Sequence, residues 1–196
     1  ETTRDILKMK SSNKLKEALD IEARKSFKSG KSLVIKAGFS QYFDLLQQLI
    51  IDEIPEPREG SPRGIILFSE DQLARDFGDY IEESFKKHDL TSDLIIEKGL
   101  RIRQRNDLYF GTELIIGTPR RLCELYYQNG FNIGELKFFM VIDINTIFKK
   151  GLRGYVSRIS ESLPKCKKVI FESAGKEDVV KAYYSEFIFP IKRLSE

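Results

Sequence analysis

The stretch "ELIIGTPRRL", residues 113 to 122, contains the change of pattern that decides the fold. A continuous apolar run ends at Gly117, and an amphipathic segment with a helical pattern begins near Pro119. Apolar residues that are continuous rather than alternating are typical of a strand buried on both faces of a parallel sheet. Thr118 is of a residue type that favours the position before a helix. We therefore predict a strand that is followed directly by a helix.

The same unit recurs along the chain. The predicted strands are Leu33 to Ala37, Gly64 to Phe68, Asp93 to Glu97, Glu113 to Gly117, Phe138 to Asp143 and Val169 to Glu172. Helices are predicted to begin near Ser40, Ser69, Arg101, Pro119, Thr146 and Lys176, with apolar residues at helical spacing. Six strand–helix units indicate an α/β fold, a doubly wound parallel sheet with helices on both faces.

Length and composition favour one folded domain. The chain has 196 residues, of which 41% are hydrophobic, enough for one sizeable core. We expect residues 1 to 29 to form a cap of one or two basic helices and residues 30 to 196 to form the α/β domain. The segment Pro55 to Arg63, with its prolines and Gly60, is predicted to be an exposed loop.

Several functional classes are disfavoured by composition. No apolar run approaches the roughly 20 residues that span a bilayer, and the first thirty residues are charged throughout, so we expect a cytoplasmic protein with no membrane partner. Cys123 and Cys166 match no metal-binding spacing, and His88 is the only histidine, so no metal site is expected. The net charge of +3 permits an anionic partner without requiring one.

Gly30, Lys31 and Ser32 are the last letters of a phosphate-binding P-loop pattern. A working P-loop follows a strand and opens a helix, so that backbone N–H groups face the phosphates. Here the predicted strand comes after the three residues, and Lys25 stands where the pattern needs its first glycine. We therefore interpret Gly30 as the turn that ends a basic helix.

Ligands of doubly wound sheets bind outside the carboxyl ends of the strands, so the residues after each strand are informative. In order they are "AGFSQ" at 37 to 41, "SEDQLA" at 69 to 74, "KG" at 98 to 99, "GTPRRL" at 117 to 122, "VIDINT" at 141 to 146 and "ESAG" at 172 to 175. From about residue 20 onward this series resembles the first RecA-like domain of the DEAD-box ATP-dependent RNA helicases. The resemblance implies a RecA-like fold, ATP and Mg²⁺ as cofactors, RNA as a partner and a second RecA-like domain.

The chain departs from the family pattern where ATP chemistry is concerned. After the first strand, "GFSQY" is a shortened loop without the P-loop lysine, and Ile144 stands where the resemblance requires the catalytic glutamate of motif II. Asp143 remains from motif II, and Ser173 and Ala174 remain from motif III. Because phosphoryl transfer depends on such electrostatic groups, we expect a degenerate domain with no catalytic residue and no bound ATP or Mg²⁺. Asp143 is expected to cap the following helix.

RNA contacts in the resembled family are made mainly to the sugar-phosphate backbone. The residues of this chain that the resemblance assigns to such contacts are Lys98, Gly99, Thr118, Arg120 and Arg121. Thr118 is expected to cap the helix at Pro119, whose positive end is an anion site. Glu70 and Asp71, expected on the same surface, would repel phosphate; Asp71 replaces an arginine of the family motif.

Three functions stay open at this point. The first is a degenerate DEAD-box domain that acts by binding RNA or a protein partner. The second is a subdomain of an active ATP-dependent RNA helicase, which needs a second RecA-like domain to close over ATP and RNA. The third is a structural protein-interaction module.

Overall fold

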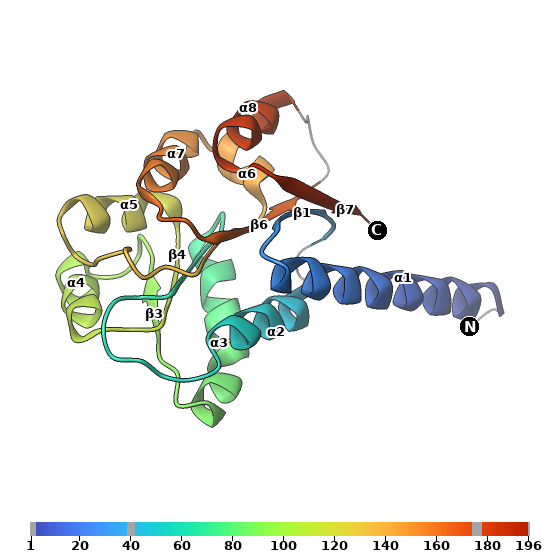
Figure 1. Ribbon diagram of the computed structural model, residues 1–196, viewed down its shortest axis with the longest axis horizontal. Helices are drawn as coiled ribbons and strands as arrows, with labels where there is room; N and C mark the ends of the chain where they lie inside the picture. Colours follow the sequence, from blue (N-terminus) through green and yellow to red (C-terminus); the bar gives the residue numbers. More distant parts are fainter. Residues whose placement is uncertain (1–2, 39–41, 174–177, 196) are drawn as a thin grey trace.

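A computed structural model describes residues 3–38, 42–173 and 178–195 as an α/β domain (Figure 1). Its described strands form one seven-stranded sheet in the order β3-β4-β2-β5-β6-β1-β7, and every neighbouring pair is parallel. The strands are β1 (Ser32–Lys36), β2 (Gly64–Leu67), β3 (Ser92–Ile95), β4 (Leu114–Gly117), β5 (Phe138–Val141), β6 (Lys167–Glu172) and β7 (Ile191–Ser195). The predicted doubly wound parallel sheet is confirmed.

Helices cover both faces of the sheet. They are α1 (Thr3–Lys28), α2 (Phe43–Glu53), α3 (Asp71–Lys87), α4 (Arg101–Phe110), α5 (Pro119–Tyr127), α6 (Ile144–Lys149), α7 (Arg153–Ser162) and α8 (Asp178–Phe187). One buried cluster joins the sheet to α1, α2 and α3, and a second joins it to α4 through α8. Within β2, Ile66 belongs to the first cluster and Ile65 to the second, which explains the continuous apolar run.

All six predicted strands are present, with ends shifted by up to two residues, and a seventh was not predicted. β7 pairs with β1 at the edge of the sheet, where most of its side chains are half-buried or exposed. Because an edge strand is not buried on both faces, it needs no continuous apolar run. The sequence of β7, "IKRLS", therefore did not predict a strand. β5 ends at Val141 rather than at Asp143, because the backbone of Asp143 turns into the left-handed region at φ 59°.

The N-terminal segment is a single helix, α1. Leu19, Ala23 and Phe27 lie on one face of it and are buried in the first core cluster, while its N-terminal part extends away from the sheet (Figure 1). The helix ends at Gly30, where φ is +80° and the N–H of Lys31 donates to the carbonyl of Ser26 at 3.2 Å. Glycine adopts this conformation without strain. The interpretation of Gly30 as a helix-ending turn is confirmed; the domain boundary at residue 29 remains a prediction.

The loop before β2 is only partly exposed. Residues 55–60 are exposed as predicted, but Pro62 and Arg63 are buried, so the prediction of exposure was wrong for the end of the segment. The guanidinium of Arg63 donates to the carbonyl of Glu56 at 2.6 Å, and its backbone N–H donates to the carbonyl of Glu113. The end of the loop thereby closes the amino edge of the sheet. None of the described helices is long and apolar enough to cross a membrane.

Candidate functional site at the carboxyl edge of the sheet

Because all strands are parallel, the residues that follow them meet at one edge of the sheet. This edge has two parts. The nucleotide half comprises residues 37–38, 42–44, 141–146 and 172–173 after β1, β5 and β6. The RNA half comprises residues 69–72, 96–101 and 117–121 after β2, β3 and β4. The names follow the roles that the resemblance implies. The predicted site residues that the structure describes are divided between these two halves.

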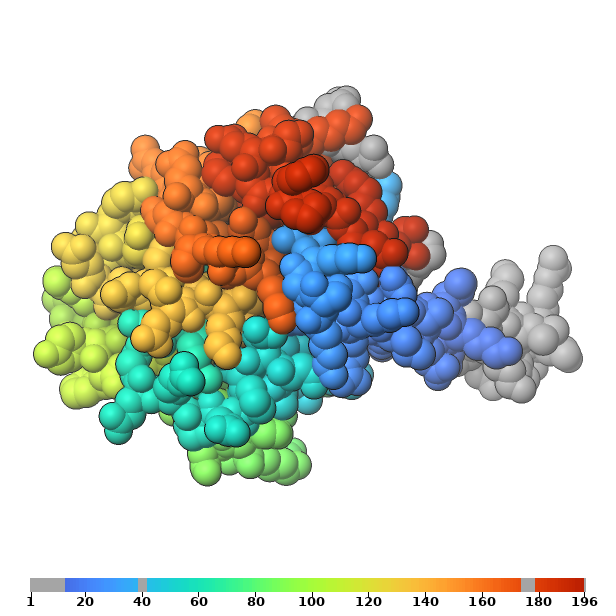
Figure 2. Space-filling model, in the orientation of Figure 1, coloured from blue at the N-terminus to red at the C-terminus, as the bar shows by residue number. Residues whose placement is uncertain are grey.

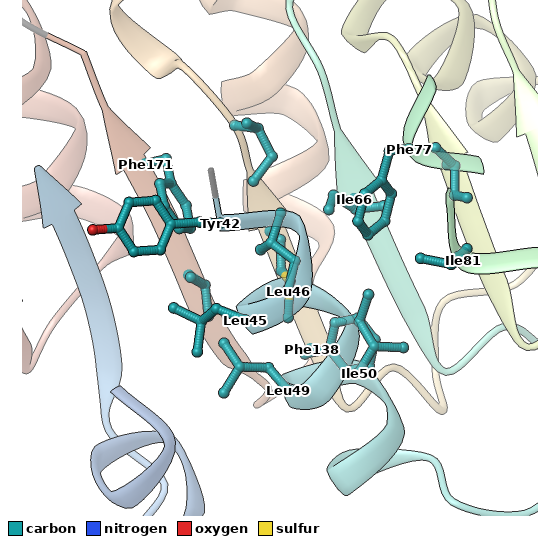
Figure 3. Close-up of a cluster of buried hydrophobic side chains, with 14 of the residues drawn as sticks. Tyr42, Leu45, Leu46, Leu49, Ile50, Ile66, Phe77, Ile81, Phe138 and Phe171 are labelled. Carbon is teal, nitrogen blue, oxygen red and sulfur yellow. The ribbon is translucent and has the colours of Figure 1, made fainter. Parts of the chain in front are cut away.

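Tyr42 occupies the start of α2, the place where a P-loop would present its phosphate-binding amides. Its side chain is fully buried, and its ring centroid lies 5.7 Å from that of Phe171 on β6 (Figure 3). Leu45 and Leu46 continue the same packing in the first turn of α2. The described start of this helix is therefore anchored by an aromatic side chain in the core. Residues 39–41 of the shortened loop lie outside the described residues.

The first turn of α2 also carries a carboxylate, Asp44, which accepts a hydrogen bond from the hydroxyl of Tyr80 on α3. Burial, together with the bond to Asp44, raises the pKa of Tyr80 to about 12, so this hydroxyl stays protonated and donates. A carboxylate at a helix N-terminus complements the helix dipole. The same negative charge opposes a phosphate at this position.

Asp143 is held by two donors from its own half of the edge. Its Oδ1 accepts the N–H of Thr146 at 3.3 Å, and the hydroxyl of Ser173 donates to the same atom at 2.6 Å. The prediction that Asp143 caps the following helix is confirmed. Ile144 is fully buried, and the side-chain oxygen of Asn145 is buried with no hydrogen-bond partner in the described part of the chain. Ala174 lies outside the described residues.

Asp71 organises the RNA half from the start of α3. Its carboxylate accepts the backbone N–H groups of Glu97 at 3.1 Å and of Lys98 at 2.9 Å. The hydroxyl of Thr118 donates to the same carboxylate at 3.4 Å. Thr118 precedes α5 as predicted, but its side chain makes no capping bond, so that part of the prediction was wrong. The reason is that the neighbouring carboxylate takes the hydroxyl.

Arg121 points into the domain rather than outward. One guanidinium nitrogen, Nη1, donates to the carbonyl of Gly99 at 2.8 Å and to the side-chain oxygen of Gln104 at 3.0 Å, and Nη2 donates to the carbonyl of Glu97 at 2.9 Å. Gln104 in turn donates to the carbonyl of Ile96 at 2.9 Å. A Cβ atom at Gly99 would lie 1.9 Å from the amide nitrogen of Gln104, so a side chain here would displace the Gln104 amide from its bonds. The backbone of residues 96–99 is thus bonded to two helices: its N–H groups donate to Asp71 on α3, and its carbonyls accept from Arg121 on α5.

Lys98 and Arg120 are the two predicted contacts whose side chains are exposed. Lys98 lines a pocket of about 440 Å³ together with Glu70, Asp71, Glu97 and Lys150. Lys150 donates to Glu70 at 2.6 Å, and Arg120 pairs with Glu124 on its own helix at 3.1 Å. The pocket lining therefore carries three carboxylates and two ammonium groups. Its net charge is negative, whereas a phosphate site needs a positive electrostatic potential.

The comparisons with known proteins agree with this geometry. The model of the DEAD/DEAH box helicase family matches residues 12–182. The chain belongs to the DEAD/DEAH box helicase family. This confirms the resemblance derived from the motif series, and the RecA-like fold is that of the solved DEAD-box structures.

Among the curated relatives of this helicase-family chain, "ATP-dependent RNA helicase DBP5" of Candida glabrata is 28% identical over 156 residues, which are 77% of this chain and 29% of the relative. "ATP-dependent RNA helicase Ddx1" of Drosophila melanogaster is 25% identical over 72% of this chain and 19% of the relative. The chain spans less than a third of the length of these relatives. Their whole-protein activities are therefore not transferred to it.

Solved structures show the shared fold. A DEAD box protein from Methanococcus jannaschii superposes with a TM-score of 0.77 at 17% identity, covering 90% of this chain and 48% of that one. Dbp5 of Saccharomyces cerevisiae, in a structure with Nup159, Gle1, IP6 and ADP, gives a TM-score of 0.75 at 18% identity over 85% of this chain and 44% of that one.

The motif series predicted residues that the structure places at the carboxyl edge of the sheet, but it missed the side chains that contact them; that this edge is a functional site remains a prediction. Tyr42, Asp44 and Gln104 were not among the predicted site residues. An acid in the first turn of a helix was a signal for Asp44, since such acids complement the helix dipole. Tyr42 carried no local signal, because its partner Phe171 lies far away in the sequence. Gln104 follows the "KG" motif in the series, but the sequence did not show that it bonds to Arg121.

Proposed function

We propose that this DEAD-box domain is a degenerate first RecA-like domain that does not hydrolyse ATP and acts by binding. The observation that carries the proposal is the buried ring of Tyr42 on Phe171, at the helix start where the family binds phosphate. A phosphate needs backbone N–H groups, a lysine and an open approach there. This helix start offers an anchored aromatic ring and the carboxylate of Asp44.

Mg²⁺ does not fit this half well either. Mg²⁺ in nucleotide sites is bound by one or two carboxylates together with substrate phosphates and water. Oδ1 of Asp143 already accepts two hydrogen bonds, and the motif II glutamate position is occupied by the buried Ile144, which leaves one carboxylate where the family pattern has two. These observations support a domain without catalytic residues and without an ATP or Mg²⁺ cofactor.

A Mg-ATP titration followed calorimetrically tests the proposal, together with phosphate release measured with and without single-stranded RNA. We expect no saturable heat in the micromolar to sub-millimolar range that is usual for substrates. Saturable binding that Asp143→Ala abolishes, with RNA-stimulated phosphate release, would support the alternative of an active ATP-dependent RNA helicase subdomain. Lys31→Ala serves as the control, because Lys31 follows the turn that ends α1 and is exposed.

RNA binding is proposed as a weak, backbone-directed activity of the RNA half. Of the predicted set, Lys98 and Arg120 present exposed cations, whereas Arg121, Gly99 and Thr118 are engaged within the loop network. Backbone contacts position a strand without reading its bases, so binding should not depend on RNA sequence. The surrounding carboxylates, including Glu70, limit the affinity.

The RNA proposal is tested by fluorescence anisotropy of a labelled single-stranded RNA at two salt concentrations. Lys98→Ala and Arg120→Ala should each lower affinity and reduce the log–log salt slope by about 0.7, the value for one phosphate contact. Lys31→Ala should change neither quantity. Absence of binding at low salt would leave protein binding as the remaining activity.

We propose as a further activity that the domain binds a protein partner or a second RecA-like domain. The structure that contains Dbp5 with Nup159 and Gle1 motivates this part of the proposal, since it belongs to a relative with the same fold. A pull-down of the chain with a separately expressed second RecA-like domain tests it; no association at micromolar concentrations would contradict that pairing. A cytoplasmic location also remains a prediction.

A further inference from the structure

The solvent face of α4 is unusually apolar. Leu100, Ile102, Tyr109 and Phe110 have exposed fractions between 76% and 86%, although they lie within or beside one short helix. At 3.6 residues per turn, Ile102, Tyr109 and Phe110 share one face at i, i+7 and i+8. The opposite face buries Gln104 and Leu108 against the domain. α4 is therefore apolar on both sides, and its outer stripe has no partner among the described residues.

Cations border this apolar stripe. Arg103 and Arg105 lie on its two sides by helical spacing, and Arg101 opens the helix. None of the three guanidinium groups makes a hydrogen bond or ion pair with another described residue. The single acid of the helix, Asp107, lies toward β3, where it raises the pKa of Asp93. The outer face of α4 thus combines large apolar side chains with unpaired guanidinium groups.

The stripe runs into a pocket at the C-terminal end of the helix. Tyr109 and Phe110 form one wall of a space of about 640 Å³, and the rest of its lining includes the apolar Pro62, Tyr126 and Phe131 and the polar Ser61, Asn129 and Asn132. The rings of Tyr126 and Phe131 lie 5.7 Å apart, which gives the pocket an aromatic side. α4 lies at the periphery of the molecule, away from β1, β6 and β7, and its atoms are at the yellow-green margin of the space-filling view (Figure 2).

We propose that the outer face of α4 binds an acidic amphipathic helix of a partner protein. Its apolar side chains would pack along Ile102 and Tyr109 and end in the pocket beside Phe110, while its carboxylates would pair with Arg103 and Arg105. Helix recognition of this kind uses apolar anchors at i, i+3, i+4 and i+7 spacing, and complementary charge selects the partner. The proposal does not depend on ATP or on RNA binding, although Leu100 and Arg101 at the start of α4 also belong to the RNA half.

The chemistry of the face favours a protein over RNA. Leu100 and Ile102 are aliphatic, and they offer no aromatic plane for a base to stack on. Tyr109 and Phe110 are packed against each other edge to face, with centroids 6.2 Å apart and an angle of 78°. Arg103 and Arg105 point to opposite sides of the helix, so they do not line one path for a phosphate backbone. Apolar anchors with flanking arginines are instead typical of protein interfaces.

The test uses the full chain as bait for a phage-displayed library of random peptides of about 20 residues, long enough to form a helix. We expect enriched peptides to carry apolar residues at helical spacing flanked by Asp and Glu. The affinity of a synthesised winner should fall at least about tenfold with Ile102→Gln and with Tyr109→Ser. The double variant R103E/R105E should also lower the affinity for this peptide, and the loss should be larger at low salt than at high salt.

Ile21→Gln is the matched control, because Ile21 is 69% exposed on another helix and should leave affinity unchanged. Circular dichroism melting of each variant verifies that the fold is kept. Failure to enrich any peptide, winners without acidic and apolar periodicity, or affinity indifferent to both α4 variants would overturn the proposal. Two other results would also overturn it. If the chain binds a labelled oligouridylate and Tyr109→Ser abolishes that binding, the face belongs to RNA. If the chain sediments as a dimer that Ile102→Gln dissociates, the face belongs to a second copy of the chain.

Discussion

The two halves of the carboxyl edge are constructed differently. In the nucleotide half, the described side chains are packed into the core: Tyr42 at the start of α2 lies on Phe171, and Ile144 is buried. In the RNA half, polar groups remain, but Asp71 and Arg121 direct their hydrogen bonds to the backbone of residues 96–99. One half is closed by apolar contacts and the other by an internal polar network.

This difference shows that two parts of one sheet edge can be stabilised by different kinds of contact. A buried ring stabilises by the apolar area that it removes from water, so it tolerates no ligand in its place. A polar network stabilises through directed bonds to carbonyl and N–H groups, and it leaves nearby side chains such as Lys98 available. The two halves should therefore respond differently to mutation.

The largest effect is expected from Tyr42→Ala. Removing a fully buried aromatic ring leaves a cavity between α2 and β6, and we expect a loss of about 3–5 kcal/mol in the free energy of unfolding. Chemical denaturation measured by circular dichroism checks this. Tyr42→Phe keeps the ring and should lose about 1 kcal/mol. Equal losses for both variants would mean that the hydroxyl, rather than ring packing, secures this half.

Arg121→Ala should have the next largest effect, because it removes three charge-assisted hydrogen bonds and leaves the carbonyls of Gly99 and Glu97 without this donor. We expect a loss of about 3 kcal/mol in unfolding free energy. Arg120→Ala is the matched control on the same helix, and its exposed pair with Glu124 should contribute at most about 0.5 kcal/mol. A small effect of Arg121→Ala would show that the guanidinium is available to a ligand after all.

Asp71→Ala should destabilise by about 2 kcal/mol, because the N–H groups of Glu97 and Lys98 lose their acceptor. Hydrogen exchange should increase at the amides of residues 97 and 98 and stay unchanged at Thr146, whose acceptor is Asp143 in the other half. Asp71→Arg, although it restores the family residue type, should also loosen this loop. Tighter RNA binding by Asp71→Arg without loss of stability would contradict the structural role.

The smallest effect concerns pH and Asp93 on β3, at the edge of the RNA half. Burial, together with the negative charge of Asp107, raises the pKa of Asp93 to about 6, above the ordinary aspartate value of 3.8. Between these values the folded state binds a proton that the unfolded state has released, so stability falls as pH rises through this window. Asp93→Asn should remove that slope and stabilise the protein at pH 7 by about 1 kcal/mol, since Asp93 is partly exposed.

Thermal unfolding at pH 4, 5, 6 and 7 measures how the stability of the protein changes with pH. Asp52→Asn is a useful comparison, because Asp52 pairs with Arg24 between α1 and α2, away from this edge. An unchanged pH profile in Asp93→Asn would mean that water reaches the carboxylate and relieves its burial.

The sequence by itself determined the features that depend on local pattern. Continuous apolar runs such as Gly64–Leu67 predicted a parallel sheet, because burial on both faces removes the need for alternation. Gly30 predicted the end of α1, and the motif series predicted the family. The missing P-loop lysine and the Ile144 substitution were also readable from the sequence alone.

Only the tertiary structure decided where the side chains of the edge point. The sequence showed that Arg121 is a cation and Asp71 an anion, but it could not show that both are bonded to a loop more than twenty residues away. Nor could it show that Tyr42 lies on Phe171, that β7 pairs with β1, or that the outer face of α4 is apolar. These features depend on contacts between distant segments, and burial and hydrogen bonding are set by the neighbours that the fold brings together rather than by residue type.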